Sequence, residues 1–161
     1  MSWEKDVEEL KRRQALVREM GGEERVTKHR SLGKLTVRER VDQLLDPGSF
    51  HEIGSMTGSA TYGPDGEMTG FVPVPFIFGR GRIDGRPVVV AGDDFTVRGG
   101  SADASGKRKQ EVAEQMAHEL RLPMIRLIDG SGGGGSVKTY EQTGFTYVPA
   151  NPAWDMVVAN L

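Results

Sequence analysis

The sequence predicts a mixed α/β fold in which helices come first and strands follow. Before residue 50, apolar residues recur with helical spacing in two segments. From Phe50 onward, short apolar runs bounded by glycine, proline and aspartate are typical of strands. Twice in the second half, such a run leads into glycines and then into a segment that can begin a helix. A chain of 161 residues fits one ordinary domain.

The first segment, SWEKDVEELKRRQALVREMGG at 2–22, predicts an amphipathic helix. Ser2 can cap its N-terminus, and Gly21 and Gly22 end it. Four apolar residues fall near one face: Val7, Leu10, Val17 and Met20. We expect this helix to be a packing arm, without a functional role for the basic residues at 11–13.

A second helix is predicted within LTVRERVDQLLDPGSF, residues 35–50. Thr36 and Glu39 have the spacing of a capping box, in which each side chain bonds the other residue's backbone N–H. The apolar stripe consists of Val37, Val41, Leu44 and Leu45. Asp46, Pro47 and Gly48 then stop the helix.

The clearest strand pattern is FVPVPFIFGRGRIDGRPVVVAGDD, residues 71–94. Asp84 and Gly85 lie between two β-rich runs, which is a strong hairpin signal. We expect the runs 76–83 and 87–91 to pair antiparallel. The second run is continuously apolar, as in a strand that is buried on both faces.

Three further elements are predicted toward the C-terminus. A helix follows the glycines at 99–100, with Val112, Met116 and Leu120 at helical spacing. LPMIRLID, residues 122–129, is another strand. In NPAWDMVVANL, residues 151–161, Asn151 can cap a last helix with Pro152 at its first position.

The composition excludes several classes of protein. Lys and Arg total 21 against 23 Asp and Glu, so the net charge of -2 argues against a nucleic-acid binder. There is no cysteine, which excludes disulfides and thiolate metal sites. No stretch approaches the roughly 18 apolar residues of a membrane span, and the N-terminus is unlike a secretory signal. We therefore expect a cytoplasmic protein. His29, His51 and His118 have no ligand spacing, so we expect surface or cap roles and no metal.

The glycine-rich stretch LIDGSGGGGSVKTYEQ, residues 127–142, has several interpretations. A phosphate loop requires Lys directly after the second glycine of GxxxxG. Gly130 and Gly135 have that separation, but two residues intervene before Lys138, so the motif fails. GGGGS at 132–136 matches a flexible linker. A linker usually separates two self-contained pieces, however, and only a short segment follows here.

A third interpretation is a backbone site for an anion. Glycines allow close approach of a ligand, and two N–H groups aimed at one carbonyl oxygen form an oxyanion hole. The glycines at 99–100 have the same context, a strand end before a helix, and the repetition favours this interpretation. The pattern alone leaves it open against two ordinary tight turns.

Three motifs in order resemble the carboxyltransferase (β) subunits of biotin-dependent acyl-CoA carboxylases, the propionyl-CoA and acetyl-CoA carboxylase group. They are GKLTVRERVDQLLDPGSFHEIG at 33–54, GRGRIDGRPVVVAGDDFTVRGGS at 79–101, and PMIRLIDGSGGGG at 123–135. The similarity extends from about Arg12 to the end of the chain. The order of the three makes it specific, since no single motif would be.

The resemblance implies a crotonase-like fold of repeated ββα units. Residues 1–34 would form a helical arm, and 35–161 part of an N-terminal carboxyltransferase domain. The implied reaction moves a carboxyl group from carboxybiotin to the α-carbon of an acyl-CoA, whose enolate is stabilised by backbone N–H groups. Acyl-CoA would be the substrate, and biotin would be carried by a partner protein. No metal is required.

The resemblance also implies roles for particular residues. Gly132 and Gly133 match the glycine pair of the acyl-CoA oxyanion hole. DGSGGGG here replaces the family's Asp-Ser-Gly-Gly-Ala-Arg, so the donor is Gly132, Gly133 or Gly134. The residues that match the first active-site loop, near the thioester, are Gly99, Gly100 and Ser101. Lys109 aligns with a family lysine that could contact CoA phosphates, together with residues 107–108, and Asp129 would orient the turn.

The family's subunits are much longer and carry a second crotonase-like domain for the biotin side. We therefore expect this chain to act with a C-terminal half or a second subunit, with a biotin carboxyl carrier or biotin carboxylase subunit, and as an oligomer. Two alternatives stay open: a non-catalytic assembly subunit, and a component of a biotin-dependent decarboxylase.

Overall fold

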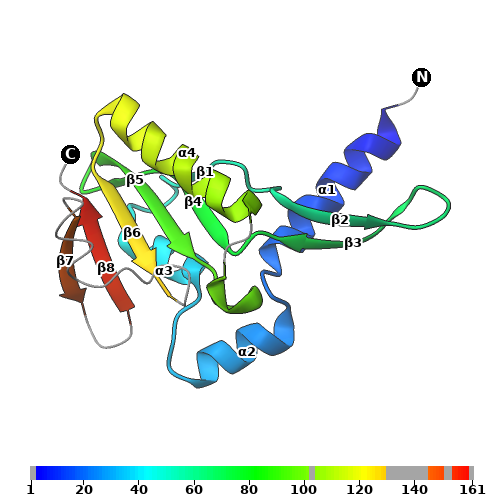
Figure 1. Cartoon of the computed structure of the whole chain (residues 1–161), viewed down its shortest axis with the longest axis horizontal. Helices are drawn as coiled ribbons and strands as arrows, with labels where there is room; N and C mark the ends of the chain where they lie inside the picture. Colours follow the sequence, from blue (N-terminus) through cyan, green and yellow to red (C-terminus); the bar gives the residue numbers. More distant parts are fainter. Residues whose placement is uncertain (1–2, 102–103, 130–144, 151–153, 160–161) are drawn as a thin grey trace.

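The computed structural model describes residues 3–101, 104–129, 145–150 and 154–159. The helices of this part are α1 Glu4–Arg18, α2 Glu23–Ser31, α3 Val37–Leu44 and α4 Ala104–Leu120. The strands are β1 His51–Glu52, β2 Gly58–Tyr62, β3 Met68–Pro73, β4 Phe76–Ile83, β5 Arg86–Asp93, β6 Met124–Ile128, β7 Phe145–Ala150 and β8 Trp154–Ala159. The predicted α/β class is confirmed (Figure 1).

A mixed sheet forms the centre of the described structure. Its strands lie in the order β1-β4-β5-β6-β8-β7, and β2 and β3 form a separate ribbon. β5 and β6 pair in parallel, whereas the other neighbours are antiparallel. The chain crosses from β5 to β6 through α4, so this unit is the strand–glycine–helix–strand arrangement that the sequence predicts. Consequently the C-terminal ends of β5 and β6 lie at the same edge of the sheet.

The hairpin between β4 and β5 is confirmed, with Phe76 paired to Asp93 and Ile83 to Arg86. Asp84 and Gly85 both have positive φ, +50° and +75°, as a tight two-residue hairpin requires. Asp46 accepts hydrogen bonds from the backbone N–H groups of both turn residues, at 2.9 and 2.8 Å. The residue predicted to end a helix therefore also anchors the hairpin.

The α3 capping box is confirmed. Thr36 Oγ1 accepts from the Glu39 backbone N–H at 3.3 Å, and Glu39 Oε2 accepts from the Thr36 N–H at 2.7 Å. The helix ends at Leu44, just before the predicted stop signal. Local sequence was sufficient here because both bonds lie within four residues.

The N-terminal helices differ from the prediction. α1 begins after Trp3, without a side-chain cap, and ends at Arg18, before the glycines; the proposed cap Ser2 lies outside the described residues. Helix α2 was not predicted from the sequence. That helix buries only Val26 and His29, too few residues to give an apolar stripe.

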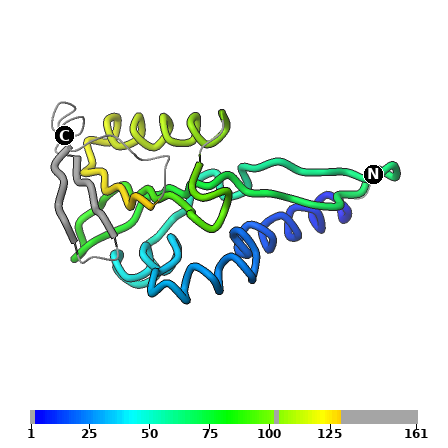
Figure 2. Tube along the Cα trace, turned by 60° about the horizontal axis from the view of Figure 1, so that its bottom comes forward, coloured from blue at the N-terminus to red at the C-terminus, as the bar shows by residue number. Residues whose placement is uncertain are grey.

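α1 and the β2–β3 ribbon project together from the body of the molecule (Figures 1 and 2). Arg12 donates to the Met68 carbonyl at 2.7 Å, and Arg13 bonds both Glu9 and the Tyr62 hydroxyl. The expectation of a packing arm is thus met on the ribbon side.

The predicted C-terminal helix is wrong. Residues Trp154–Ala159 form strand β8, which pairs with β6 on one side and β7 on the other. The proposed cap residues Asn151 and Pro152 lie outside the described part. The segment contains two adjacent valines, Val157 and Val158, whose β-branched side chains favour strands, and the free edge of β6 supplies a pairing partner.

Candidate functional site

The turn that follows β5 is tied to the connection between α1 and α2. Thr96 donates to Asp94 Oδ1 through its backbone N–H and its hydroxyl, at 3.0 and 2.5 Å. The same hydroxyl accepts from the Gly21 N–H at 3.0 Å, and a Cβ at Gly21 would overlap the Thr96 carbonyl. Glycine at this position therefore allows the two segments to close on each other. Burial raises the pKa of Asp94, although the bonds from Thr96 oppose the shift.

The glycine pair in this turn has a left-handed backbone, with φ of +65° at Gly99 and +73° at Gly100. The Gly100 N–H donates to the Val97 carbonyl at 3.0 Å, and the Ser101 N–H to the Arg98 carbonyl at 3.3 Å. Within the described residues, no backbone acceptor lies within bonding distance of the Gly99 N–H. The Gly100 and Ser101 N–H groups therefore bond within the turn, whereas the Gly99 N–H can donate to an oxygen of a ligand.

A buried ion pair joins the ends of β5 and β6. Arg126 Nη2 donates to Asp93 Oδ1 at 2.9 Å, and the guanidinium lies 4.8 Å from the centre of the Phe76 ring. The side-chain amide of Gln110, on α4, faces the same guanidinium. Burial raises the pKa of Asp93, and the charge of Arg126 opposes that shift. This pair fixes the spacing of the two strand ends from which the glycine segments start.

Asp129 follows β6 and is held by residues from the other end of the chain. Its Oδ1 lies 3.1 Å from Lys34 Nζ, and its Oδ2 lies 3.4 Å from His29 Nε2. The expected role of Asp129, orienting the start of the glycine run, stays a prediction because that run lies outside the described residues. His29 is buried, which corrects its expected surface position; its Nε2 also lies 3.1 Å from the Leu35 carbonyl oxygen.

Lys109 is one of the buried residues of α4. Only 6% of the residue is exposed, and burial lowers the pKa of its ammonium group to about 8. It lines a pocket of about 520 Å³ between α4 and the 53–57 segment, to which no residue of the turn contributes. The expected contact of Lys109 with CoA therefore stays a prediction.

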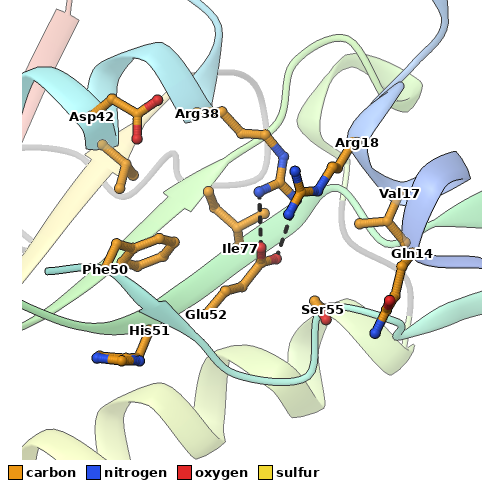
Figure 3. Close-up of a pocket in the computed structure, with 11 residues that line it drawn as sticks. Gln14, Val17, Arg18, Arg38, Asp42, Phe50, His51, Glu52, Ser55 and Ile77 are labelled. Atoms are coloured by element: carbon orange, nitrogen blue, oxygen red, sulfur yellow. Dashed lines mark hydrogen bonds and ion pairs between the residues drawn. The ribbon is translucent and has the colours of Figure 1, made fainter. Parts of the chain in front are cut away.

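A larger hollow, of about 630 Å³, lies between α1, α3 and β1 (Figure 3). Arg38 donates to both carboxylate oxygens of Glu52 there, at 2.8 and 3.3 Å. Arg18 and Asp42 add further charges, and Phe50 and Ile77 form part of its wall. The turn after β5 contributes no lining residue, so the geometry of that turn, rather than hollow size, defines the candidate site.

Comparison with known proteins identifies the family. Residues 28–146 match the model of the carboxyl transferase domain, and the chain belongs to that family. It is 40% identical over 129 residues to the methylmalonyl-CoA carboxyltransferase 12S subunit of Propionibacterium freudenreichii subsp. shermanii, covering 78% of this chain and 24% of the relative. It is 41% identical over 128 residues to the human mitochondrial propionyl-CoA carboxylase beta chain, covering 77% and 23% respectively.

Solved structures agree. A crystal structure of transcarboxylase 12S superposes with a TM-score of 0.68 at 37% identity, over 85% of this chain and 26% of that one. The beta subunit of geranyl-CoA carboxylase from P. aeruginosa gives 0.56 at 26% identity, over 84% and 23%. The fold is thus that of a crotonase-like carboxyltransferase domain, of which this chain forms a part. The chain spans about a quarter of the length of these proteins.

The expected site residues divide into three groups. Gly99, Gly100 and Ser101 lie together in the turn after β5. Lys109 lies in a separate pocket. Gly132, Gly133 and Gly134 lie outside the described residues.

Several polar residues were missed from sequence, chiefly Arg126 with Asp93 and Arg38 with Glu52. The signal for Arg126 was present, because it interrupts an otherwise apolar strand. None of the described helices is long and apolar enough to cross a bilayer. The described residues also contain no cluster of His, Cys, Asp or Glu suited to a metal.

Proposed function

We propose that this chain is the acyl-CoA-binding part of a biotin-dependent carboxyltransferase. The observation that carries the proposal is the carboxyl transferase domain match over residues 28–146, with relatives named as acyl-CoA carboxylase and carboxyltransferase subunits. In this proposal the chain binds the acyl-CoA. The turn after β5 receives the thioester, and the glycine run after β6 supplies the second set of N–H donors.

The chemistry needs a stabilised enolate. Removal of the α-proton places negative charge on the thioester oxygen, and preorganised N–H groups lower the energy of that state. Carboxybiotin, when bound, supplies the carboxyl group and the base. We assign the Gly99 N–H as a donor on this side, because Gly100 and Ser101 bond within the turn. Gly132, Gly133 and Gly134 remain the candidates on the other side.

The relatives support a proposal about the partner subunits of this chain. We propose that a carboxyltransferase C-terminal half or second subunit provides the biotin side, and that a biotin carboxyl carrier or biotin carboxylase subunit delivers the cofactor. An oligomeric assembly is part of the same proposal. One related structure is described as a hexamer assembly with bound methylmalonyl-coenzyme A. A cytoplasmic location is also retained as a proposal, beside relatives named as mitochondrial.

The test is calorimetric titration of the full chain with propionyl-CoA, with and without partner subunits. Gly99→Ala should weaken binding by about tenfold or more, because its Cβ enters the space proposed for the thioester. Gly66→Ala is the matched control. Both glycines have positive φ, +65° and +80°, and neither has an atom within 4 Å of a built Cβ, so the two changes carry similar backbone strain.

Gly133→Pro tests the second donor set in the same titration, because proline removes the N–H. Saturable binding that is lost in Gly99→Ala and Gly133→Pro, and kept in Gly66→Ala, supports the proposal. Failure of the folded chain to bind propionyl-CoA in either setting overturns it and favours the non-catalytic assembly subunit.

A further inference from the structure

The pocket between α4 and the 53–57 segment contains a buried cation without a direct partner. Lys109 is 6% exposed, yet among the described residues no hydrogen bond or ion pair to its ammonium group is present. A largely buried ammonium is costly, because the group loses much of its hydration. The sequence thus places a charge where an apolar residue would be more stable.

The carboxylate whose charge acts on Lys109 is already occupied. Glu52 attracts the Lys109 charge, but both of its oxygens accept from Arg38, at 2.8 and 3.3 Å (Figure 3). Arg38 in turn repels Lys109. The Arg38–Glu52 pair is thus close to neutral as seen from Lys109, and the cation is left for another anion.

The rest of the pocket is apolar with a polar rim. Its wall includes Ile53, Phe78 and Val112, and its remaining lining residues are Gly54, Thr57, Ala104, Ser105 and Arg108. Gly54 has φ of +62°, and a Cβ built there would lie 3.6 Å from Lys109 Cε, so this segment approaches the lysine stem closely. A volume of about 520 Å³ is in the range that holds a small molecule.

We infer that this pocket binds a small organic carboxylate, with the carboxylate on Lys109 and a short alkyl chain against Ile53, Phe78 and Val112. The other cation of the lining, Arg108, is paired with Glu111 at 3.0 Å. The ammonium of Lys109 alone matches a monoanion, whereas a phosphate dianion needs several converging donors. The apolar wall gains free energy from an alkyl tail but not from an inorganic ion. The site is distinct from the turn after β5 and does not require the proposed carboxyl transfer.

The test titrates butyrate into the full chain and follows amide chemical shifts. Butanol, which has the same alkyl length and no charge, is the comparison probe, and phosphate is the second. Lys109→Met keeps the length of the stem and removes the charge. Lys107→Met is the matched control, because it makes the same change at an exposed position of the same helix.

Butyrate should bind the wild type saturably, shift the amides of 53–57 and 104–112, and lose about tenfold or more in affinity in Lys109→Met. Lys107→Met should bind like the wild type, and butanol and phosphate more weakly than butyrate. Equal binding of butyrate and butanol by the wild type overturns the inference without reference to any variant. So does equal butyrate affinity in the wild type and Lys109→Met.

Two sources have this chemistry: a free carboxylic acid, and the terminal carboxylate of a carboxylated acyl thioester. Methylmalonyl-CoA and propionyl-CoA, titrated into both proteins, separate them. A preference for methylmalonyl-CoA that disappears in Lys109→Met identifies the thioester as the source. Butyrate binding with no such preference identifies the free acid. Since butyrate carries no CoA, failure of the proposed acyl-CoA function leaves this test intact.

Discussion

The two faces of the central sheet are built differently. On the α3 face, the apolar cluster is entirely aliphatic: Val37, Val41, Leu45, Ile77, Val88, Val90, Ile125 and Leu127. The helix also buries Arg40, whose guanidinium donates to the Ile128 carbonyl oxygen at 3.4 Å. The α4 face carries an apolar cluster around Phe76, Phe78 and Val89, but it also buries the Arg126–Asp93 pair and Lys109. The α3 face thus buries one arginine against a backbone carbonyl, whereas the α4 face buries an ion pair and a lysine.

The α4 face is the one that carries the proposed Lys109 pocket. Close packing on the α3 face is shown by Gly92, where a Cβ would lie only 2.5 Å from Val37 Cγ2. Helix and strand therefore approach each other closely at this position. On the α4 face, by contrast, burial of charge costs free energy unless partners compensate for it. Such a cost is commonly retained where the charge binds or positions something.

The largest expected effect is that of breaking the Arg126–Asp93 pair. Asp93→Asn should lower the free energy of unfolding by about 3–5 kcal/mol, because it leaves a buried guanidinium without its carboxylate. Urea denaturation followed by circular dichroism measures the loss. The double variant Asp93→Leu with Arg126→Met should recover most of it. A loss below about 1 kcal/mol in the single variant would show that the pair is no more than a surface-type interaction.

The α3 face should respond to lost volume rather than lost charge. Leu127→Ala removes a fully buried side chain and should cost about 2–5 kcal/mol, through lost burial and the cavity left behind. The same urea experiment measures it, and the loss should be independent of pH. Leu32→Ala, at an exposed position, is the control and should change stability by less than about 0.5 kcal/mol. Similar losses for the two would contradict the assigned core.

Lys109 should give the α4 face a distinctive pH dependence. Its pKa is about 8 in the folded chain and near 10.5 when unfolded, so between these values the unfolded state holds a proton that the folded state lacks. Stability from this group therefore rises as pH increases from about 8 to 10.5, by up to about 3 kcal/mol. Lys109→Met should abolish that rise and be more stable than the wild type at neutral pH.

Melting temperatures measured across this pH range, for wild type and Lys109→Met side by side, isolate the contribution of Lys109 from those of other groups. Lys107→Met should follow the wild-type profile. Parallel profiles for the wild type and Lys109→Met would show that Lys109 is solvated in the folded chain.

The smallest effect concerns the entry to the α3 face. Thr36→Ala removes one half of the capping box and should cost about 1 kcal/mol. Thr36→Ser keeps the acceptor oxygen and should cost less, so the two melting temperatures should differ. Burial raises the pKa of Glu39, yet the hydrogen bonds from Thr36 and Arg30 outweigh it and hold that pKa below its usual value. Equal losses for alanine and serine would show that the hydroxyl bond contributes nothing.

The candidate site was only partly predictable. The turn at Gly99–Ser101 was located from its glycines and its place between a strand and a helix, both of which are local features. Which N–H group stays unpaired there depends on carbonyls whose positions are set by the folded turn. The contacts that hold Asp129 were hidden for a different reason: His29 and Lys34 are far from it in sequence.

The sequence by itself determined the features that depend on neighbours within a few residues: the α3 capping box, the Asp84–Gly85 hairpin and the strand–glycine–helix order. Only the tertiary structure decided that Trp154–Ala159 pairs as a strand, that Arg126 meets Asp93, and that Lys109 turns inward. The physical reason is that pairing edges and buried charges depend on partners brought together by folding. Local propensity carries no information about which of those partners will be present.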